Sequence, residues 1–226
     1  LERIRVDNIY QGLVTRDETN EIVPALATDY TVSPDGLTYT FTLQEGVVFH
    51  GGQPLTSADV VASYTAVQTD PTVIGNRDFD NVASVTAPDA TTVVITLTEP
   101  DINFLFTLTT PAGLVFSAGD TTDLKTAANG TGPFIFDSWK RKDSIKFTRN
   151  DAYWGDKAKT ERLIVRWGAE AAQRLVELQA GTADGIDNDG PTDFATVEGN
   201  PDLQLLQREG LNTMYIGMNN RFAPFT

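Results

Sequence analysis

Alternation of apolar and polar side chains predicts β-strands in the first half of the chain. Apolar residues alternate with threonines over residues 37–43 and again over residues 93–97. This period of two places one face of a strand on a core. The residues Ser33-Pro34-Asp35-Gly36 precede the first strand and are typical of a tight turn. Residues 82–86, with a turn at Pro88-Asp89, form a hairpin with the second strand.

Apolar residues at helical spacing give a weaker signal, in segments before, between and after these strands. Thr56 followed by Asp59 resembles a capping box, and an apolar stripe with helical spacing continues from there until Pro71 stops the helix. Residues 4–14 show a loose helical spacing of apolar side chains. Residues 104–108 predict a short apolar helix.

The second half of the chain alternates strands with a helix. Residues 134–147 predict a hairpin, residues 163–167 a strand, residues 170–180 a helix, and residues 214–219 a final strand. Residues 117–131 are small, polar and glycine-bearing, which marks a connection between subdomains. We therefore expect a mixed α/β or α+β protein with a β-rich insertion.

Composition excludes several classes of protein. The chain has 226 residues, a formal net charge of −14 and no cysteine. Its longest run of positive residues is 140–142, so it lacks the basic stripe that displaces counterions from nucleic acid. The absence of cysteine excludes thiol catalysis, thiolate metal sites and disulfides. No apolar stretch approaches the ~20 residues that span a bilayer, so we expect no nucleic-acid partner and no membrane insertion by this segment.

His50 is the only histidine of the chain, and this limits the possible catalytic chemistry. A Ser-His-Asp triad would need it as the base, and a catalytic zinc site usually needs two or three imidazoles. No G-x-S-x-G elbow accompanies it, so we interpret His50 as a loop or cleft-edge residue. The stretch Gly130-Thr131-Gly132 lacks the lysine and the spacing of a nucleotide-binding loop. We therefore expect no cofactor, no metal site and no catalytic residues.

Acidic residues crowd one stretch, in which Asp184, Asp187 and Asp189 precede Gly190. A calcium loop with its glycine at Gly190 would place Thr196 at the twelfth position, where an acidic ligand is required. The calcium hypothesis therefore fails. The cluster is either a set of solvated loop carboxylates or a polar group that faces a ligand cleft. The many acidic residues also leave a carboxylate-dependent hydrolase as an alternative function.

Several motifs resemble those of family 5 solute-binding proteins, the dipeptide, oligopeptide and nickel receptors of ABC importers. Residues 8–13 resemble the family segment N-I-Y-E-G-L. Residues 46–56 resemble G-V-x-F-H-D-G-x-P-L-T, with Gly51 where the family usually has Asp. Residues 130–134 are similar to G-T-G-P-Y/F, and residues 149–154 to R-N-x-x-Y-W. The motifs are in order, correctly spaced and spread over the chain, so they are specific as a set.

The resemblance implies the fold of a type II periplasmic binding protein, in which two lobes enclose a cleft. Family chains are considerably longer than this one, so we expect the first lobe only, with the second lobe absent. Residues 13–116 would form a β-rich subdomain, inserted into an incomplete α/β subdomain of residues 1–12 and 117–226. The implied location is the periplasm, or the cell surface as a lipoprotein, and no signal segment is visible in this chain.

The resemblance also implies a function. The intact protein would be a receptor and not an enzyme, capturing a small, peptide-like solute by lobe closure and delivering it to the permease of an ABC importer. The residues that we expect to contact the solute are Arg77, Asp187, Asn188, Thr213 and Tyr215. Besides the hydrolase, a protein-interaction or sensor module on the same fold is a second alternative.

Overall fold

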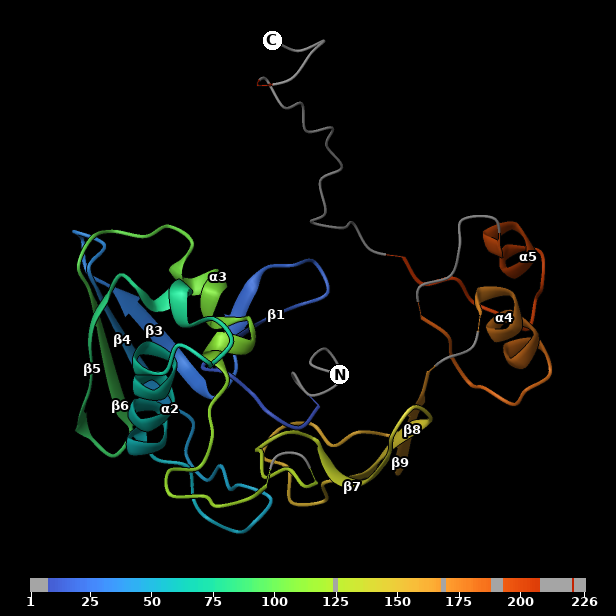
Figure 1. Cartoon of the computed structure of the whole chain (residues 1–226), viewed down its shortest axis with the longest axis horizontal. Coiled ribbons are helices and arrows are strands. Elements are labelled where there is room, and N and C mark those ends of the chain that lie inside the picture. Colours follow the sequence, from blue (N-terminus) through green and yellow to red (C-terminus); the bar gives the residue numbers. More distant parts are fainter. Residues whose placement is uncertain (1–7, 124–125, 168–169, 188–192, 208–220, 222–226) are drawn as a thin grey trace. The chain divides into compact units, whose positions relative to one another are not determined.

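The computed structural model of the chain describes residues 8–123, 126–167, 170–187, 193–207 and 221 (Figure 1). The chain divides into two compact units, Leu1–Ala169 and Glu170–Thr226. The first unit contains three antiparallel sheets and several helices, and two helices are described in the second unit. Among the helices in the described part of the chain, none is long and apolar enough to cross a membrane.

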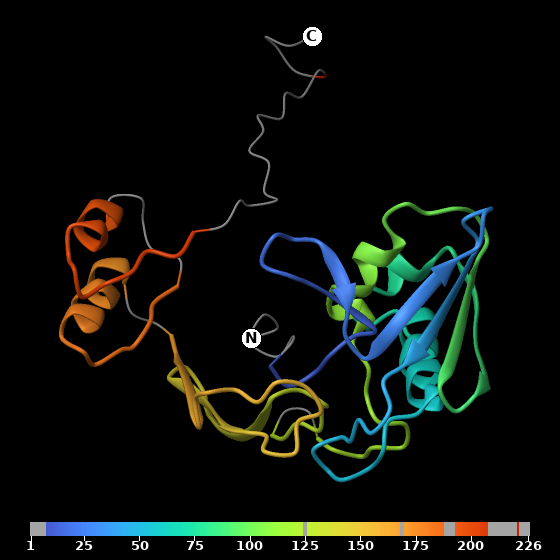
Figure 2. The same ribbon diagram turned by 180° about the vertical axis from the view of Figure 1, so that it is seen from behind.

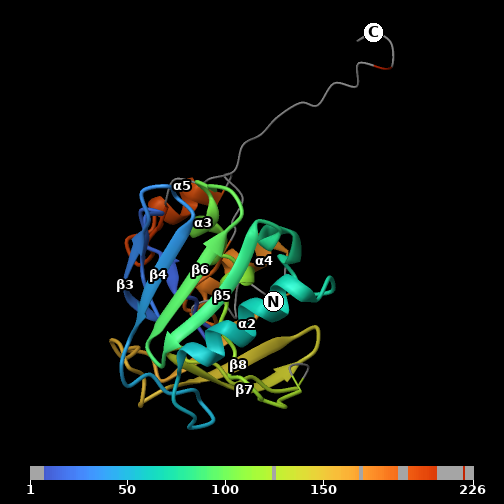
Figure 3. The same ribbon diagram turned by 90° about the vertical axis from the view of Figure 1, so that its left-hand side faces the viewer.

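The first unit contains an antiparallel four-stranded sheet (Figure 3). In spatial order it consists of β3 (Ala27–Val32), β4 (Thr38–Leu43), β6 (Thr92–Leu97) and β5 (Val82–Asp89). Every second residue of the two inner strands is buried, which confirms the alternation over residues 37–43 and 93–97. The turn before β4 is also confirmed, since Gly36 has a φ of 72°, a conformation that glycine adopts without steric cost.

The hairpin between β5 and β6 turns later than the sequence indicates. β5 continues to Asp89, and the turn lies at Ala90 and Thr91. The Asp89 carboxylate closes this turn by accepting hydrogen bonds from the Thr91 backbone N–H at 2.9 Å and from the Thr91 hydroxyl at 3.1 Å. Hydrogen bonds to this carboxylate hold the pKa of Asp89 below its ordinary value, and the bond from the Thr91 backbone makes the largest contribution.

The same kind of turn recurs in the chain. Three other aspartates accept a hydrogen bond from the backbone N–H of a threonine two residues later: Asp17, Asp70 and Asp120.

Helix α2 (Ser57–Thr69) packs against strands β5 and β6 of this sheet (Figure 1). The backbone N–H of Thr56 donates to the Asp59 carboxylate at 2.8 Å, which is the reciprocal bond of a capping box. Val60, Tyr64 and Val67 are buried. The predicted start of this helix and its apolar stripe are therefore confirmed.

Asp59 also ties α2 to the chain that follows the four-stranded sheet. Its second carboxylate oxygen accepts from the Ala118 backbone N–H at 2.7 Å, and the residue is 6% exposed. Because Asp59→Ala removes both bonds, we expect the free energy of unfolding to fall by roughly 1–3 kcal/mol. Urea unfolding measures this loss, and Glu99→Ala, which removes an exposed carboxylate, is the control with an expected change within about 0.5 kcal/mol. Equal stabilities of the two variants would contradict this role of Asp59.

The described part of residues 4–14 contains no helix, so the helical spacing predicted there is wrong from the first described residue onward. The carbonyl groups of this segment bond to distant parts of the chain. Ile9 O accepts from Gly132 N at 2.9 Å, and Gln11 O accepts from Val115 N at 3.0 Å. These long-range bonds take the place of the i to i+4 bonds of a helix. The described apolar residues of this segment, Ile9, Tyr10, Leu13 and Val14, are all buried.

Five further elements of the first unit are short. They are β1 (Val14–Arg16), β2 (Ile22–Pro24), α3 (Phe104–Leu108) and the 3-10 helices η1 (Asn76–Phe79) and η2 (Pro111–Gly113). β1 and β2 pair antiparallel with each other. The predicted helix over residues 104–108 is confirmed as α3.

A three-stranded antiparallel sheet follows residues 117–131. It contains β7 (Phe134–Lys140), β8 (Ser144–Arg149) and β9 (Arg162–Arg166) in this order. The hairpin predicted over residues 134–147 and the strand predicted over residues 163–167 are confirmed. Figure 2 shows the connection that leads from the α3 region to this sheet.

Two clusters of buried apolar residues stabilise the first unit. The buried members of the larger cluster all lie between Leu13 and Val115. The smaller cluster includes Ile9, Ile145 and Phe147 and belongs to the three-stranded sheet. The division between the clusters lies near the boundaries expected for a β-rich subdomain of residues 13–116, and that subdomain assignment stays a prediction.

The second unit contains α4 (Ala171–Gln179) and α5 (Phe194–Glu198). The helix predicted over residues 170–180 is confirmed as α4, and Gly181 follows it with a φ of 69°, as is common after a helix C-terminus. Helix α5 has five residues, too few to show a helical period in the sequence. The strand predicted over residues 214–219 lies outside the described residues.

Candidate functional site

Four segments that are far apart in the sequence meet in the first unit. They are residues 8–13, 48–54, 129–134 and 149–154, and each contains part of one motif quoted above. We call their meeting point the motif junction. Figures 1 and 2 show the loop of residues 48–54 beside the connection that leads into β7, and the His50 backbone N–H donates to Gly130 O at 2.8 Å.

Gln11 is the hydrogen-bonding centre of the motif junction and is 6% exposed. Its amide oxygen accepts from Thr131 Oγ1 and Trp154 Nε1, both at 3.1 Å. Its amide nitrogen donates to the Tyr153 hydroxyl at 2.9 Å. One buried side chain therefore connects three segments, and a satisfied buried network of this kind favours a single arrangement of the chain.

Gly130 and Gly132 allow two backbones to touch at the motif junction. A Cβ atom on Gly130 would lie 1.9 Å from Ile9 O, and one on Gly132 would lie 2.5 Å from Asn8 O. The Gly132 N–H donates to Ile9 O at 2.9 Å, and the Phe134 N–H donates to Asn8 O at 3.0 Å. These two amides bond inside the protein, whereas a phosphate-binding loop presents its amides to a ligand.

His50 joins the loop of residues 48–54 to the glycine motif. Its Nε2 atom bonds to Gly132 O at 3.0 Å, and the side chain is half-buried. Burial lowers the pKa of His50, and the bond to the Gly132 carbonyl opposes this to a smaller extent. A triad base would be oriented by a carboxylate rather than by a backbone carbonyl. The geometry therefore agrees with the interpretation of His50 as a loop residue.

Asn129 connects the same loop to the segment that precedes β7. Its Oδ1 atom accepts from the Gly51 backbone N–H at 2.8 Å, and its Nδ2 atom donates to Asp120 Oδ2 at 3.0 Å. The Thr122 hydroxyl chiefly, and the Asn129 amide to a lesser extent, hold the pKa of Asp120 below its ordinary value. Since the bond at Gly51 uses the backbone, this loop contact does not require the Asp that the family usually has there.

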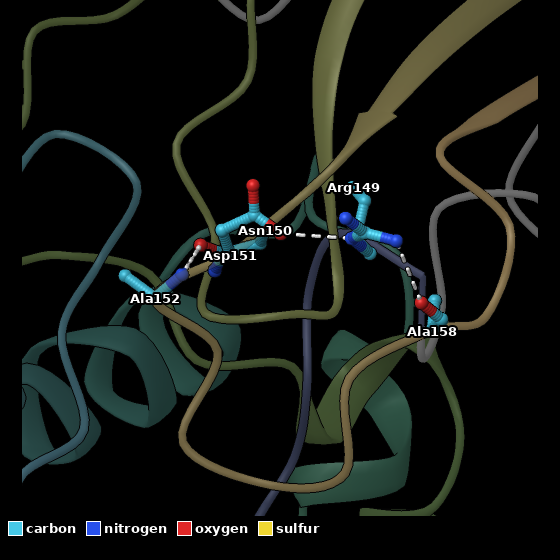
Figure 4. Close-up of polar contacts among 5 residues, drawn as sticks. All are labelled: Arg149, Asn150, Asp151, Ala152 and Ala158. Atoms are coloured by element: carbon cyan, nitrogen blue, oxygen red, sulfur yellow. Dashed lines mark hydrogen bonds and ion pairs between the residues drawn. The ribbon is translucent and has the colours of Figure 1, made fainter.

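The loop after β8 supplies the fourth segment (Figure 4). The Asn150 amide nitrogen donates to Gly132 O at 3.1 Å, the same carbonyl that bonds to the imidazole. Next to it, Arg149 Nε pairs with Asp151 Oδ1 at 2.8 Å, and Arg149 NH1 reaches Ala158 O at 3.5 Å. These contacts fold the loop back on itself and hold Asn150 against the glycine motif.

Two of the five residues predicted to contact solute lie in the described part of the chain. Arg77 is exposed in η1, and Asp187 is exposed in the loop that follows α4. Asn188, Thr213 and Tyr215 lie outside the described residues. Arg77 and Asp187 belong to different units, and all five positions stay predictions.

The sequence pattern did not indicate the buried polar side chains of the motif junction. Four such residues are less than 9% exposed: Gln11, Asn129, Thr131 and Asn150. Each stands beside or within a glycine-containing or aromatic motif, which is the only sequence signal that they carry. The side-chain hydrogen bonds that join the four segments to one another are between neutral groups, which can hold the segments in register. Within the described residues, no three His, Asp or Glu side chains gather to hold a metal ion.

Comparison with known proteins places this chain among binding proteins. Heme-binding protein A of Haemophilus influenzae is 33% identical over 96% of this chain and 45% of its own length. Di/tripeptide-binding protein 1 of Pseudomonas aeruginosa is 30% identical over 91% of this chain and 43% of its own length. The chain therefore spans less than half the length of these relatives.

Solved structures agree on the fold. HbpA2 from Haemophilus parasuis superimposes with a TM-score of 0.81 and 33% identity, over 97% of this chain and 49% of that protein. The agropinic acid complex of the PBP AgaA from A. tumefaciens R10 gives a TM-score of 0.80 with 29% identity, over 85% of this chain and 40% of AgaA. These likenesses confirm a mixed α/β fold of the type II periplasmic binding protein kind. The family model described as bacterial extracellular solute-binding proteins, family 5 middle, matches residues 21–226, and this chain belongs to that family.

Proposed function

We propose that the complete protein is an extracytoplasmic receptor that encloses a small solute between two lobes and delivers it to the permease of an ABC importer. The match of residues 21–226 to the solute-binding family carries this proposal. Solved structures similar to this chain contain agropinic acid, Ni(L-His) and the peptide STSA. In this proposal the chain forms one side of the cleft, and closure excludes water so that a few hydrogen bonds determine specificity.

Binding without bond cleavage accounts for the chemistry of the first unit. The motif junction engages the imidazole of His50 with a backbone carbonyl, and the side chains that bond around Gln11 are neutral amides, hydroxyls and aromatic rings. The named relatives are binding proteins. We therefore assign no reaction to this protein, and turnover of peptides or glycosides by the complete protein would contradict that assignment.

A peptide-like molecule is the solute class that we propose. Similar proteins are named for di- and tripeptides and for glutathione. A zwitterionic peptide needs an anion for its ammonium group, and the exposed carboxylate of Asp187 would supply this charge. Native mass spectrometry of the complete protein, purified without added ligand, identifies the solute directly. A co-purified molecule without peptide character would overturn this class and leave the receptor proposal intact.

Asp187 provides a specific test of the proposed contacts. Asp187→Asn in the complete protein should weaken the affinity for the identified solute about tenfold or more, because a charged hydrogen bond is lost. Asp184→Asn is the matched control, since it removes an exposed charge from the same loop. Titration calorimetry on both variants measures the difference. If both variants bind like the parent protein, Asp187 does not contact the solute.

The delivery step requires a membrane partner, and we propose the permease of an importer. The family is extracellular by its description, and we infer that the protein works in the periplasm or as a lipoprotein on the cell surface. Co-purification with the permease from detergent-solubilised membranes, with and without solute, tests the partnership. Incorporation of labelled fatty acid into the protein tests the lipid anchor.

A further inference from the structure

One ring nitrogen of His50, Nε2, forms a hydrogen bond, whereas the other, Nδ1, has no partner among the described residues. Its Nε2 atom bonds to Gly132 O at 3.0 Å, and because a carbonyl only accepts, Nε2 must carry the hydrogen. The neutral ring therefore has no hydrogen on Nδ1. This Nδ1 atom is buried and has no hydrogen-bond partner among the described residues. The site suits a neutral imidazole and offers no acceptor for a second N–H.

We propose that the motif junction is an acid-sensitive joint, in which protonation of His50 weakens the hold of the loop of residues 48–54 on the glycine motif. A proton on Nδ1 would create a buried N–H that has no acceptor. It would also give the half-buried ring a positive charge, and both changes are unfavourable. The ring can relieve this cost by moving towards water. That movement would strain the neighbouring bonds of the loop, from His50 N to Gly130 O and from Gly51 N to Asn129 Oδ1.

The charged groups near this loop are engaged elsewhere. On the connecting segment, Asp120 accepts from Thr122 and Asn129. On the loop after β8, Arg149 and Asp151 pair with each other. Residues 8–13 contain no charged side chain, and on the stretch that leads to His50 itself Glu45 is exposed. In the described part of the chain, two causes shift the pKa of His50: its burial and its hydrogen bond to the Gly132 carbonyl. No carboxylate contributes to the shift.

The sign of the pH dependence follows from this environment. Burial lowers the pKa of His50 in the folded chain below its ordinary value of 6.5. The unfolded chain therefore takes up a proton first as the pH falls, so the stability is complete above pH 6.5 and declines below it. His50 is the only histidine of the chain. A loss of stability between neutral pH and the range where carboxylates titrate can therefore be assigned to one side chain.

Urea unfolding of the full chain at pH 7.5 and pH 5.5 tests the joint. If the folded imidazole stays neutral, the unfolding equilibrium constant should rise by a factor that approaches ten between these two pH values. His50→Gln retains an N–H that can reach Gly132 O and cannot titrate, so its constant should change less than twofold. An equal pH dependence in the parent chain and in His50→Gln would overturn the proposal.

Two measurements on the parent chain keep the test independent of how the variant folds. A proton NMR titration of the single imidazole should give a pKa below 6.5, and a value at or above 6.5 would also overturn the proposal. Amide hydrogen exchange, corrected for the intrinsic effect of pH, should increase at Gly51 on acidification. The Leu43 amide, bonded to Thr91 O at 2.7 Å in the four-stranded sheet, is the internal reference. Equal changes at the two amides would argue against local weakening.

Discussion

Replacing Gly130 with alanine should cost this protein roughly 3 kcal/mol or more of its free energy of unfolding. The added Cβ atom would lie 1.9 Å from Ile9 O, and the Ile9 carbonyl carbon would be 2.6 Å away. Both are backbone atoms, so a rotamer change cannot relieve the clash. The φ of Gly130 is not in the positive range, so the cost comes from the close approach alone. Urea unfolding followed by circular dichroism measures the loss.

Two further glycine variants test whether the loss of stability comes from the close contact between the two backbones. Gly132→Ala would bring a Cβ atom to 2.5 Å from Asn8 O, and we expect a loss of similar size. Gly185→Ala has no atom within 4 Å of the new Cβ and no positive φ, so its effect should stay within about 1 kcal/mol and can be stabilising. If Gly130→Ala and Gly185→Ala have the same stability, the two backbones at the motif junction are not in contact.

The strands of the first unit were predictable because their pattern is local. Residues 37–43 and 93–97 place a buried apolar side chain at every second position, and each strand is fixed by its own residues. The capping pair Thr56 and Asp59 is likewise a contact within one turn of chain. Local rules of this kind do not need the rest of the fold.

The errors occur where distant contacts override local spacing. The segment that begins at Ile9 has a loose helical spacing, yet its carbonyls bond to Gly132 and Val115. Those partners are more than 100 residues away in the sequence, so no local pattern reveals them. The late turn between β5 and β6 has a local cause. The Asp89 side chain accepts a hydrogen bond from Thr91 and closes the turn after the strand, so Asp89 itself remains in the strand.

The candidate solute contacts and the motif junction differ in how far the sequence could predict them. Arg77 and Asp187 were chosen by resemblance to a family, and their exposure is compatible with ligand contact without demonstrating it. The motif junction was not predicted at all, although its motifs were recognised. Its key bonds join residues 120 to 143 positions apart. Motif recognition identified the segments, and only the coordinates showed that the segments bond to one another.

Gln11→Ala should lower the free energy of unfolding by about 2–4 kcal/mol, the second large effect that we expect. The change removes the acceptor for Thr131 Oγ1 and Trp154 Nε1 and the donor to the Tyr153 hydroxyl. Since Gln11 is 6% exposed, water cannot readily replace these bonds. Fluorescence and circular dichroism during urea unfolding measure the loss, and the indole N–H resonance of Trp154 should shift because its hydrogen bond is gone.

Gln11→Glu separates the loss of bonds from the loss of volume. A carboxylate can accept from Thr131 and Trp154 as the amide oxygen does, and the Tyr153 hydroxyl can reverse its role and donate. We therefore expect Gln11→Glu to lose less than half as much stability as Gln11→Ala at neutral pH, in keeping with the Glu of the family segment N-I-Y-E-G-L. Gln53→Ala, which truncates an exposed glutamine of the adjacent loop, should stay within about 0.5 kcal/mol of the parent chain. A Gln11→Ala variant as stable as Gln53→Ala would show that the network around Gln11 contributes nothing to the junction.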